Sequence, residues 1–354
     1  MAHIAYFLHG RGRGHAARSL PIVRAMRALG HQVSLYGGGD ALDLTRPDDA
    51  MQLCPPVLPG KGVLSTAWRR VRQDMQRLQG VDVVVSDGDM PSLIAARWKG
   101  LPCVAVGHEL VFSDCVLPGG LPGSAIAFQR VNTWHSAALP TRSVAVHFLA
   151  IEPSHSSVVV ARPDLASQRV SSCEDPSLCV AYFRDANGDD ALRAAVAHGL
   201  RVICYGPANS SVAGVEYRPF DASGFASQLA SCRAVICSSG SNLLAECVQL
   251  QKPFLAVYRA NDAEQRLNAL LCERAGVAMA AELGNAAAAV AQFRQRLERN
   301  DFATYPLAEA LPSVTDAVLQ TVDEVLVVHR QKLSGRNRSR RLLPAATSVQ
   351  PPRA

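Results

Sequence analysis

The sequence has no apolar run that approaches the roughly 20 residues needed to cross a bilayer, so we expect no membrane-spanning helix. Its first residues, MAHIAYFLHGRGRGH, lack the basic segment and the small-residue cleavage site of a signal peptide, and they are typical of a first strand. The 10 cysteines are scattered without a C-x-x-C pair, which argues against a zinc site and suits a reducing compartment. These absences predict a globular, cytoplasmic protein.

Charged residues are also few, at 19% of the chain against 48% hydrophobic, and this balance excludes a disordered protein. A chain of 354 residues usually holds two domains, each with its own core. From Arg330 onward there are seven basic residues and no acidic one. The net charge of +6 therefore belongs to this end of the chain, and the body is close to neutral.

We expect residues 331–354 to form a basic, disordered tail, because this end is also rich in Ser, Pro, Asn and Gly. One interpretation is a solvated tail without a partner. Another is peripheral contact with the inner face of a membrane, because anionic lipid head groups attract clustered Lys and Arg. Nucleic acid is the weakest of these candidate partners.

The stretch from Arg233 to Asn268 carries the strongest pattern. It predicts a buried strand over Ala234–Cys237, a polar Ser-Ser-Gly-Ser turn, a helix, and a second strand over Phe254–Tyr258. Such a turn places free backbone N–H groups and a helix N-terminus at the carboxyl edge of a sheet. This arrangement attracts phosphate, so we expect half of a nucleotide-binding layer here.

The amino-terminal end predicts a strand over Ile4–His9, a glycine loop, a helix that ends at Gly30, and another strand. Pro21 is compatible only with the first turn of that helix, so we expect the helix to begin close to it. Gly12 and Gly14 belong to the loop and let the backbone approach a ligand. His15 is either a base that takes a proton from an acceptor hydroxyl or a capping residue.

A third predicted strand, Val81–Ser86, ends in Asp87-Gly88-Asp89. A D-x-D pattern can hold a divalent cation, but here we favour a turn that caps the helix over Pro91–Lys99, with Asp87 pointing into a cleft. His108 and Glu109 follow the next strand and are weaker candidates. The helical pattern over residues 65–79 is basic on one side, which indicates a solvated face or a site for an anionic or lipid-linked acceptor.

Strands and helices alternate in both halves of the chain. We therefore predict an α/β fold with two Rossmann-like, doubly wound domains that face each other across a cleft. The expected divisions are an acceptor domain over residues 1–155, a linker over 156–176 and a nucleotide-sugar domain over 177–330. The tail over 331–354 follows them.

Two motifs resemble glycosyltransferases of the GT-B fold, such as the N-acetylglucosaminyltransferase of peptidoglycan synthesis and the UDP-glycosyltransferase superfamily. Gly10 to His15 is similar to the glycine loop and histidine of the acceptor-binding domain. Ser239 to Glu246, together with Asp262 to Ala269, is similar to the donor signature. The resemblance covers roughly residues 1–300.

The resemblance implies a role for each matching residue. The diphosphate would be held by backbone N–H groups of Ser239, Gly240, Ser241 and Asn242. The remaining donor contacts would come from Glu246 to the ribose, Glu264 and Gln265 to the transferred sugar, and Phe220 through its main chain to uracil. His15 would be the base, with Asp87 as its orienting partner.

Two departures from the family pattern leave part of this site open. The glycine-serine loop of the family is replaced by residues 183–188, and Glu264 stands where relatives often have Asp or Gln. Asp262 and Gln265 also form a capping box, which by itself accounts for both residues.

The expected activity is inverting transfer from a nucleotide sugar, a UDP-sugar first of all, to a hydroxyl acceptor without a metal or other cofactor. A UDP-sugar 2-epimerase on the same fold is an alternative, as is a non-catalytic nucleotide-binding protein or one that acts through its basic tail. A nicotinamide-dependent oxidoreductase is disfavoured, because the G-x-G-x-x-G fingerprint is missing.

Overall fold

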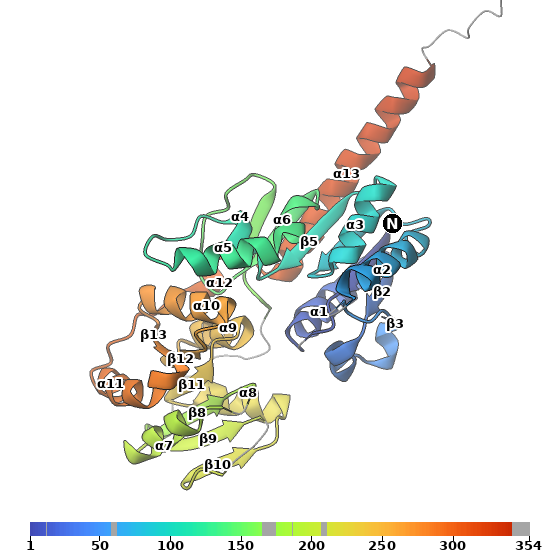
Figure 1. Ribbon diagram of the computed structural model, residues 1–354. Coiled ribbons are helices and arrows are strands. Elements are labelled where there is room, and N and C mark those ends of the chain that lie inside the picture. The colour runs from blue at the N-terminus through green and yellow to red at the C-terminus, as the bar shows by residue number, and fades with distance from the viewer. Residues whose placement is uncertain (12, 58–61, 165–174, 186, 207–210, 342–354) are drawn as a thin grey trace, which may run out of the picture.

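The computed structural model describes residues 1–11, 13–57, 62–164, 175–185, 187–206 and 211–341. It contains two parallel sheets, each flanked by helices, which form two lobes (Figure 1). The predicted α/β fold with two doubly wound domains is therefore confirmed.

The first lobe is built on a sheet of seven strands in the order β3-β2-β1-β4-β5-β6-β7. Its strands are β1 (His3–Leu8), β2 (Gln32–Gly37), β3 (Gln52–Leu53), β4 (Val83–Asp87), β5 (Cys103–Gly107), β6 (Arg142–Val146) and β7 (Val158–Ala161). Its helices are α1 (Arg13–Ala28), α2 (Val63–Arg77), α3 (Met90–Lys99), α4 (Leu110–Asp114), α5 (Gly123–Asn132) and α6 (Trp134–Ala138), with short 3-10 turns η1 (Gly39–Leu44) and η2 (Pro47–Asp49).

The second sheet has six strands in the order β10-β9-β8-β11-β12-β13. They are β8 (Leu178–Tyr182), β9 (Arg201–Tyr205), β10 (Val215–Arg218), β11 (Ala234–Ser238), β12 (Phe254–Tyr258) and β13 (Ala278–Glu282). The helices that follow in the chain are α7 (Asp189–Ala197), α8 (Ala222–Ser231), α9 (Ser241–Leu250), α10 (Ala263–Arg274), α11 (Ala286–Glu298), α12 (Leu307–Ala310) and α13 (Val314–Arg341), with the turn η3 (Leu283–Asn285).

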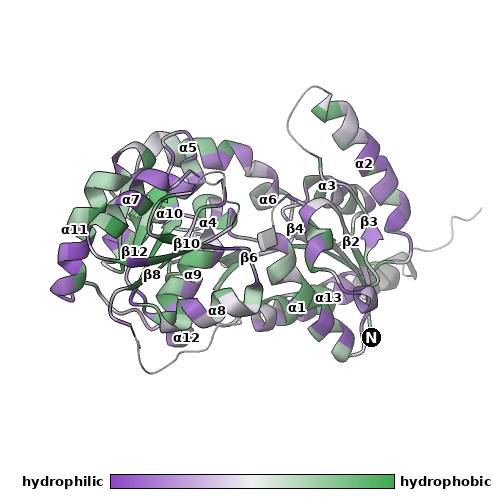
Figure 2. Ribbon diagram, turned by 90° about the horizontal axis from the view of Figure 1, so that it is seen from below, coloured by the Kyte–Doolittle hydropathy of each residue, from purple (hydrophilic) through white to green (hydrophobic). Residues whose placement is uncertain are grey.

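The central strands are short apolar runs because both faces of each sheet are covered by helices. In β4 and β5 every residue is buried, and in β11 and β12 all but the last residue are. Figure 2 shows stretches of hydrophilic residues on outer helices such as α2 and α11. The described cysteines are buried and unpaired, as expected of small core residues.

In each sheet, the order in which the chain adds strands reverses at one place. The chain moves outward from β1 to β3 and then returns to start β4 beside β1, and the second lobe does the same between β8 and β11. In open α/β sheets, ligands bind at the carboxyl ends of the strands at such a switch point. The fold therefore marks the ends of β4 and β11 as the places to look for a site.

The lobes are joined by a common core. One hydrophobic cluster contains Phe112 and Phe148 from the first lobe together with Leu244, Leu267 and Leu271 from the second. Helix α5 packs on α10 across the junction. The relative placement of the two sheets is thus set by buried side chains.

The last helix does not follow the predicted division of the chain. α13 packs on α1 and β6, and its buried face, which includes Val314, Val318 and Val322, belongs to the core of the first lobe. It also continues to Arg341, so residues 331–341 are helical where a disordered tail was predicted. The backbone hydrogen bonds of the helix continue past the last apolar residues that pack on the first lobe. The apolar pattern of the sequence therefore did not mark the end of the helix. Residues 342–354 lie outside the described part.

The predicted linker also needs correction at its start. β7 lies within residues 156–176 and pairs with β6, so the first sheet extends at least to Ala161. Residues 165–174 of that segment are outside the described residues. No helix in the described part of the chain combines the length and the hydrophobicity that a bilayer span requires.

Candidate active site

The first half of the site is a buried cluster around Asp87, the last residue of β4. Its carboxylate accepts a hydrogen bond from His15 Nδ1 (2.7 Å). Arg18 donates to both carboxylate oxygens, through Nε (3.0 Å) and Nη2 (2.5 Å), and Ser19 donates from Oγ (2.7 Å). The structure therefore brings the two predicted catalytic residues into contact.

His15, Arg18 and Ser19 reach one carboxylate because they occupy positions i, i+3 and i+4 of α1 and share one face of the helix. Gly88 makes room for the imidazole. It has a positive φ of 71°, and a Cβ added to it would stand 3.1 Å from His15 Cε1. A larger residue at this position would be strained and would press on the ring.

Helix α1 begins at Arg13, not close to Pro21 as predicted. Pro21 lies inside the helix, where its missing N–H leaves the carbonyl of Ala17 without a helical partner. Both residues are exposed, so water can hydrate that carbonyl. Gly14 therefore belongs to the first turn of the helix and not to a loop, and Gly12 is outside the described residues.

The charges of the cluster define how His15 behaves. Burial by itself lowers the pKa of His15, but Asp87 outweighs it, so the pKa is raised above the ordinary value of about 6.5. Burial likewise opposes ionisation of Asp87, yet Arg18 and His15 hold its pKa far below the usual range. Since an ionised carboxylate only accepts, Nδ1 carries a proton, and in the neutral ring Nε2 holds the lone pair. Arg18 Nη2 lies 3.4 Å from the same Nδ1, but the shorter carboxylate contact decides the tautomer.

Glu109 stands near this cluster and was only a weak candidate from the sequence. Burial raises its pKa, and the charge of His15 acts in the opposite direction. Its Oε1 accepts a hydrogen bond from Ser136 at 3.4 Å. The cluster thus includes a second carboxyl group that holds its proton to a higher pH than an exposed glutamate.

Asp89 has a structural role. It is the N-cap of α3, where it accepts from the backbone N–H of Ser92 (3.2 Å) and pairs with Arg70 (3.1 Å). The capping interpretation of the D-x-D pattern is therefore confirmed for this residue. Arg70 is buried in that ion pair, so it is not part of the solvated face predicted for residues 65–79.

The second half of the site is the turn between β11 and α9. Ser239 donates its N–H and its hydroxyl to the carbonyl of Val257 (3.0 and 2.9 Å), and Gly240 donates its N–H to Ser238 (2.8 Å). These two N–H groups are used inside the turn. They are therefore not free to hold a phosphate, contrary to the prediction. The helix begins at Ser241, and Gly240 at its N-cap position gives no side-chain cap. The N–H groups of Ser241 and Asn242 lie in the first turn of α9, where a helix leaves its donors without partners inside the helix and where an anion can be held.

The two halves meet where α1 and α9 begin. A Cβ added to Gly14, the second residue of α1, would stand 3.0 Å from Nδ2 of Asn242, the second residue of α9. A side chain at position 14 would therefore crowd the Asn242 side chain, and glycine leaves room for it. Because His15 follows Gly14, this approach brings the His15–Asp87 pair next to the start of α9.

The other predicted donor contacts line the second lobe. Glu246 is partly buried and lies one turn beyond Asn242 on the same side of α9. Phe220 follows β10, is 41% exposed, and packs its ring against Tyr182 and Phe225.

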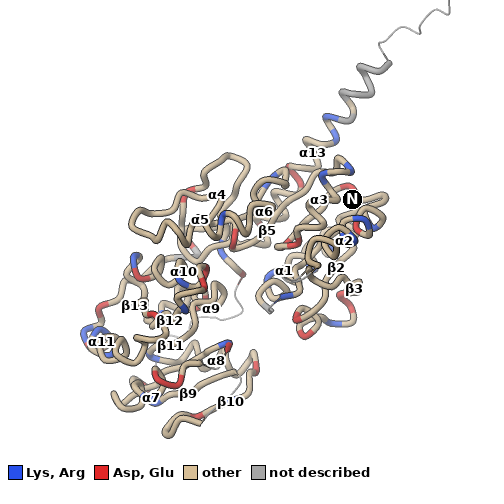
Figure 3. Tube along the Cα trace, in the orientation of Figure 1, with Lys and Arg blue, Asp and Glu red and all other residues tan. Residues whose placement is uncertain are grey.

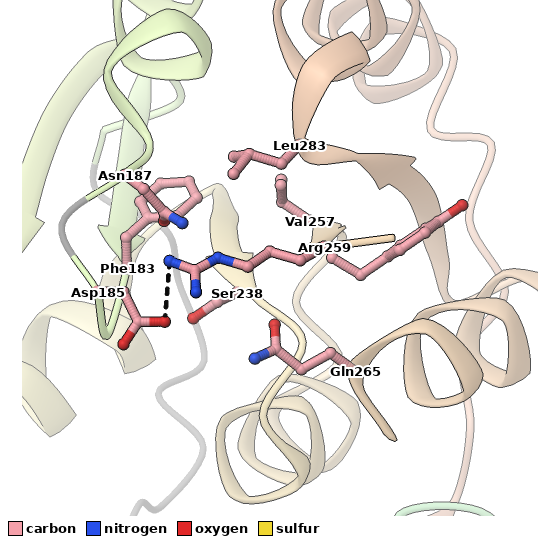
Figure 4. A pocket seen from close by; sticks show the side chains of 9 residues that line it. Phe183, Asp185, Asn187, Ser238, Val257, Arg259, Gln265 and Leu283 are labelled. Carbon is pink, nitrogen blue, oxygen red and sulfur yellow. Dashed lines mark ion pairs between the residues drawn. The ribbon is translucent and has the colours of Figure 1, made fainter. Parts of the chain in front are cut away.

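Gln265 lies in a small pocket at the carboxyl ends of β8, β11 and β12 (Figure 4). Asp262 caps α10 by accepting from the Gln265 N–H (3.0 Å), and the Gln265 side chain donates back to Asp262 (2.9 Å). Only the first half of the predicted capping box is present, because the Asp262 N–H donates to the carbonyl of Arg259 (3.1 Å) and not to the Gln265 side chain. Glu264 is partly buried in the same first turn.

An arginine that the sequence analysis did not single out crosses the same pocket. Arg259 pairs with Asp185 (3.2 Å) and also donates to the amide oxygen of Asn187 (2.7 and 2.9 Å) in the amide orientation that matches donors with acceptors. It connects the end of β12 to the loop after β8, which replaces the glycine-serine loop of the family. Arg259 directly follows the predicted strand Phe254–Tyr258, and this position at the carboxyl edge of the sheet could have marked it as a site residue.

Arg18 and Ser19 were missed for a different reason. Their spacing from His15 becomes visible only if the helix is extended back to Arg13, which Pro21 discouraged.

Comparisons with known proteins agree with this geometry. A family model described as glycosyl transferase family 1 matches residues 63–298. A protein of Methanosarcina acetivorans described as an uncharacterized glycosyltransferase is 28% identical over 150 residues, which is 38% of this chain and 38% of that protein.

Solved structures are similar over nearly the whole chain. MurG of Acinetobacter baumannii has a TM-score of 0.65 at 15% identity, covering 92% of this chain and 100% of that one. The glycotransferase of kitacinnamycin has a TM-score of 0.61 at 16% identity, with 92% and 99% covered. SsfS6 of Streptomyces sp. SF2575, in complex with thymidine diphosphate, has a TM-score of 0.58 at 17% identity, and the match covers 92% of this chain and 100% of that one.

At these identities the structural likeness concerns the fold, and the family rests on the sequence match. Because the family model covers more than half of the chain, the protein belongs to glycosyl transferase family 1, and its two lobes form the GT-B fold of a glycosyltransferase.

Proposed function

We propose that the protein transfers a sugar from a nucleotide sugar, first of all a UDP-sugar, to an acceptor hydroxyl, with inversion of the anomeric centre and without a metal. The observation that carries this proposal is the contact of Gly14 with Asn242. It supports a site with a histidine–carboxylate pair on one side and a helix N-terminus on the other. A base and an anion site on opposite sides of one reacting carbon are what such a transfer requires.

His15 is the proposed base. Its Nδ1–H is held by Asp87, so Nε2 is the atom that takes the proton from the acceptor hydroxyl as the hydroxyl attacks. Asp87 stabilises the imidazolium that forms, and Arg18 keeps the carboxylate ionised. The sugar–oxygen bond to the phosphate breaks on the opposite face, so a single displacement inverts the anomeric carbon.

The leaving nucleoside diphosphate gains negative charge as that bond breaks. The first-turn N–H groups of Ser241 and Asn242 and the dipole of α9 would stabilise this charge. Glu246 would bind the ribose hydroxyls and Phe220 would flank the base. Glu264 and Gln265 would contact the transferred sugar.

The choice of base in the nucleotide rests on similarity. SsfS6 is solved with thymidine diphosphate and VinC with DTDP, and both share the fold of this chain. Thymidine and uridine diphosphates are therefore the two probes to compare.

Glu109 supports a second candidate function. A UDP-sugar 2-epimerase on this fold needs a carboxyl group in the cleft, and burial raises the pKa of Glu109 beside His15. An epimerase releases the nucleotide or interconverts sugars when no acceptor is present, whereas the transferase needs an acceptor hydroxyl.

We also propose that the protein works in the cytoplasm and contacts the anionic face of a membrane. The basic end of the chain supports this proposal, and so does the surface of α2 and α3. Trp68 and Trp98 are half-exposed there, their ring centroids 5.1 Å apart, and Arg72 lies over Trp68. Asp74, the only acidic residue of these two helices, is fully buried. Figure 3 shows the basic residues on these helices.

Thermal unfolding with UDP, TDP, UDP-sugars and NAD tests the donor site. A ligand that binds only the folded protein raises the melting temperature, so UDP or TDP should stabilise the wild type. Glu246→Ala should lose this stabilisation, and His15→Ala should retain it but lose transfer. Stabilisation by NAD alone, or wild-type transfer by both variants, would overturn the proposal.

A further inference from the structure

A buried chain of hydrogen bonds joins the two lobes beneath the candidate site. His108, which follows β5, has Nδ1 at 2.9 Å from the carbonyl oxygen of Val146 and Nε2 at 2.8 Å from Asn268 Oδ1. Both partners are acceptors, so both contacts are hydrogen bonds when each ring nitrogen carries a proton. Asn268, on α10, donates from Nδ2 to the carbonyl oxygen of Ser239 (3.2 Å). His108 is 4% exposed and Asn268 is fully buried.

The amide of Asn268 fits this place in one orientation. Its nitrogen must face Ser239, because a carbonyl only accepts, and its oxygen is then left to accept from His108. A carboxylate of the same shape keeps the bond from His108 but cannot donate to Ser239. A leucine of similar size would keep neither bond.

The chain of hydrogen bonds ends at Ser239, just before the helix α9 whose first turn is proposed to bind the diphosphate. Val257 holds the N–H and hydroxyl of Ser239, and Asn268 holds its carbonyl. That peptide is therefore fixed between β12 and α10, and through His108 it is tied to β6 of the first lobe.

The polar chain lies among apolar groups. The rings of Phe112 and Phe148 pack against His108 with centroids 5.4 and 5.6 Å away. A buried polar network is costly unless every member is paired, but once paired it selects one arrangement of the elements it joins. Apolar packing alone gives cohesion without that selection.

We propose that His108 and Asn268 are positioning residues of the donor site. They fix the first turn of α9 relative to the His15–Asp87 pair, so that the diphosphate is held at the distance from the base that transfer requires. Glu109, the next residue after His108, is within electrostatic reach of His15. The segment after β5 therefore carries one residue that acts on the charge of His15 and another that is linked, through Asn268, to the donor turn. This inference rests on the proposed function.

Asn268→Asp tests it, with Thr321→Val as the matched control. Thr321 is also buried and hydrogen-bonded, to the carbonyl of Ala317 (2.6 Å), but it lies in α13 away from the turn. Calorimetric titration with UDP and TDP should give a Kd about tenfold weaker for Asn268→Asp than for wild type, because the Ser239 carbonyl loses its donor. Donor KM should rise and acceptor KM should stay unchanged. Thr321→Val should bind like the wild type.

The first lobe offers a second pair of variants. His108→Gln keeps an N–H that can donate toward Asn268, whereas His108→Leu keeps none. His108→Gln should therefore retain more nucleotide affinity than His108→Leu at matched melting temperature. Equal loss in both, or a wild-type Kd in Asn268→Asp, would overturn the inference.

Amide hydrogen exchange separates this inference from the proposed function, because it needs no ligand. The N–H groups of residues 239–243 should exchange about tenfold faster in Asn268→Asp and at the wild-type rate in Thr321→Val. A wild type that binds neither UDP nor TDP would remove the proposed function. Unchanged exchange in Asn268→Asp would remove the positioning role alone.

Discussion

At the residue scale, the His15–Asp87 pair makes the rate of the proposed reaction depend on pH. A base must be unprotonated, so kcat/KM should fall as the pH decreases through the pKa of His15. Asp87 raises that pKa, which places the acidic limb of the profile above about pH 6.5.

Asp87→Asn should move this limb to lower pH. The substitution removes the negative charge but leaves the ring largely buried, and burial lowers the pKa of His15. The rate at the optimum should also fall by about 100-fold or more, because the base loses its orienting partner. The measurement is kcat/KM between pH 5 and 9, a range of about four units around the ordinary pKa of an imidazole.

Ser19→Ala is the control for that experiment. It removes one hydrogen bond to Asp87 (2.7 Å) and leaves the charge in place, so the limb should not shift. A limb that is the same in Asp87→Asn and wild type would show that another group is the base, and Glu109 would be the next to test.

At the element scale, the elements that the sequence predicted best are those whose burial alone fixes their pattern. β4 and β12 have both faces covered, so they appear as continuous apolar runs. The start of α1 could not be predicted in the same way. Pro21 argues for a helix boundary, but it lies on the exposed side of α1, where the unpaired carbonyl is hydrated.

The side chains of the site show the same division. His15 and Asp87 could be predicted because each follows a strand at the carboxyl edge of the sheet. Arg18 could not, because its role depends on where α1 begins, and Asn268 could not, because its two partners come from distant segments.

Helix α13 gives a prediction about stability. An amphipathic stripe shows that a helix packs on something but does not name the lobe, and the structure places α13 on the first. Val318 is fully buried and Val327 is 53% exposed on the same helix. Val318→Asp should therefore destabilise the first lobe by about 3 kcal/mol or more, because it buries a carboxylate. Val327→Asp should change stability by about 0.5 kcal/mol or less.

Urea unfolding followed by tryptophan fluorescence measures this difference. The three tryptophans, Trp68, Trp98 and Trp134, all belong to the first lobe, so their signal reports its unfolding. The midpoint should fall in Val318→Asp and stay in place in Val327→Asp. Equal midpoints for the two variants would contradict the packing of α13 on this lobe.

At the scale of the whole molecule, the charges are divided between the lobes in a way that favours one orientation at a surface. α13 lies on the first lobe and carries the basic end of the chain away from it (Figure 1). The α2–α3 surface, with Leu64, Trp68, Trp98, Arg69 and Arg72 exposed, belongs to the same lobe. Exposed tryptophans beside arginines suit the interface between anionic head groups and acyl chains.

Vesicle co-sedimentation tests this orientation. The wild type should bind phosphatidylcholine vesicles that contain phosphatidylglycerol and should leave pure phosphatidylcholine vesicles unbound. Arg69→Ala/Arg72→Ala should weaken binding by roughly 30-fold, since each basic residue near the surface contributes about 1 kcal/mol. Arg294→Ala/Arg299→Ala removes one arginine of α11 and the one that directly follows it, both in the second lobe, and should leave binding unchanged.

Removal of residues 331–354 separates the two contributions on the first lobe. If the basic end alone holds the membrane, the truncated protein loses binding and the α2 variant keeps it. If both surfaces contribute, each change weakens binding and the two together abolish it, because weak peripheral contacts need more than one signal for stable attachment. Binding that is the same for neutral and anionic vesicles, or that is lost equally in the α11 control, would contradict the proposed orientation and leave the transferase site as it is.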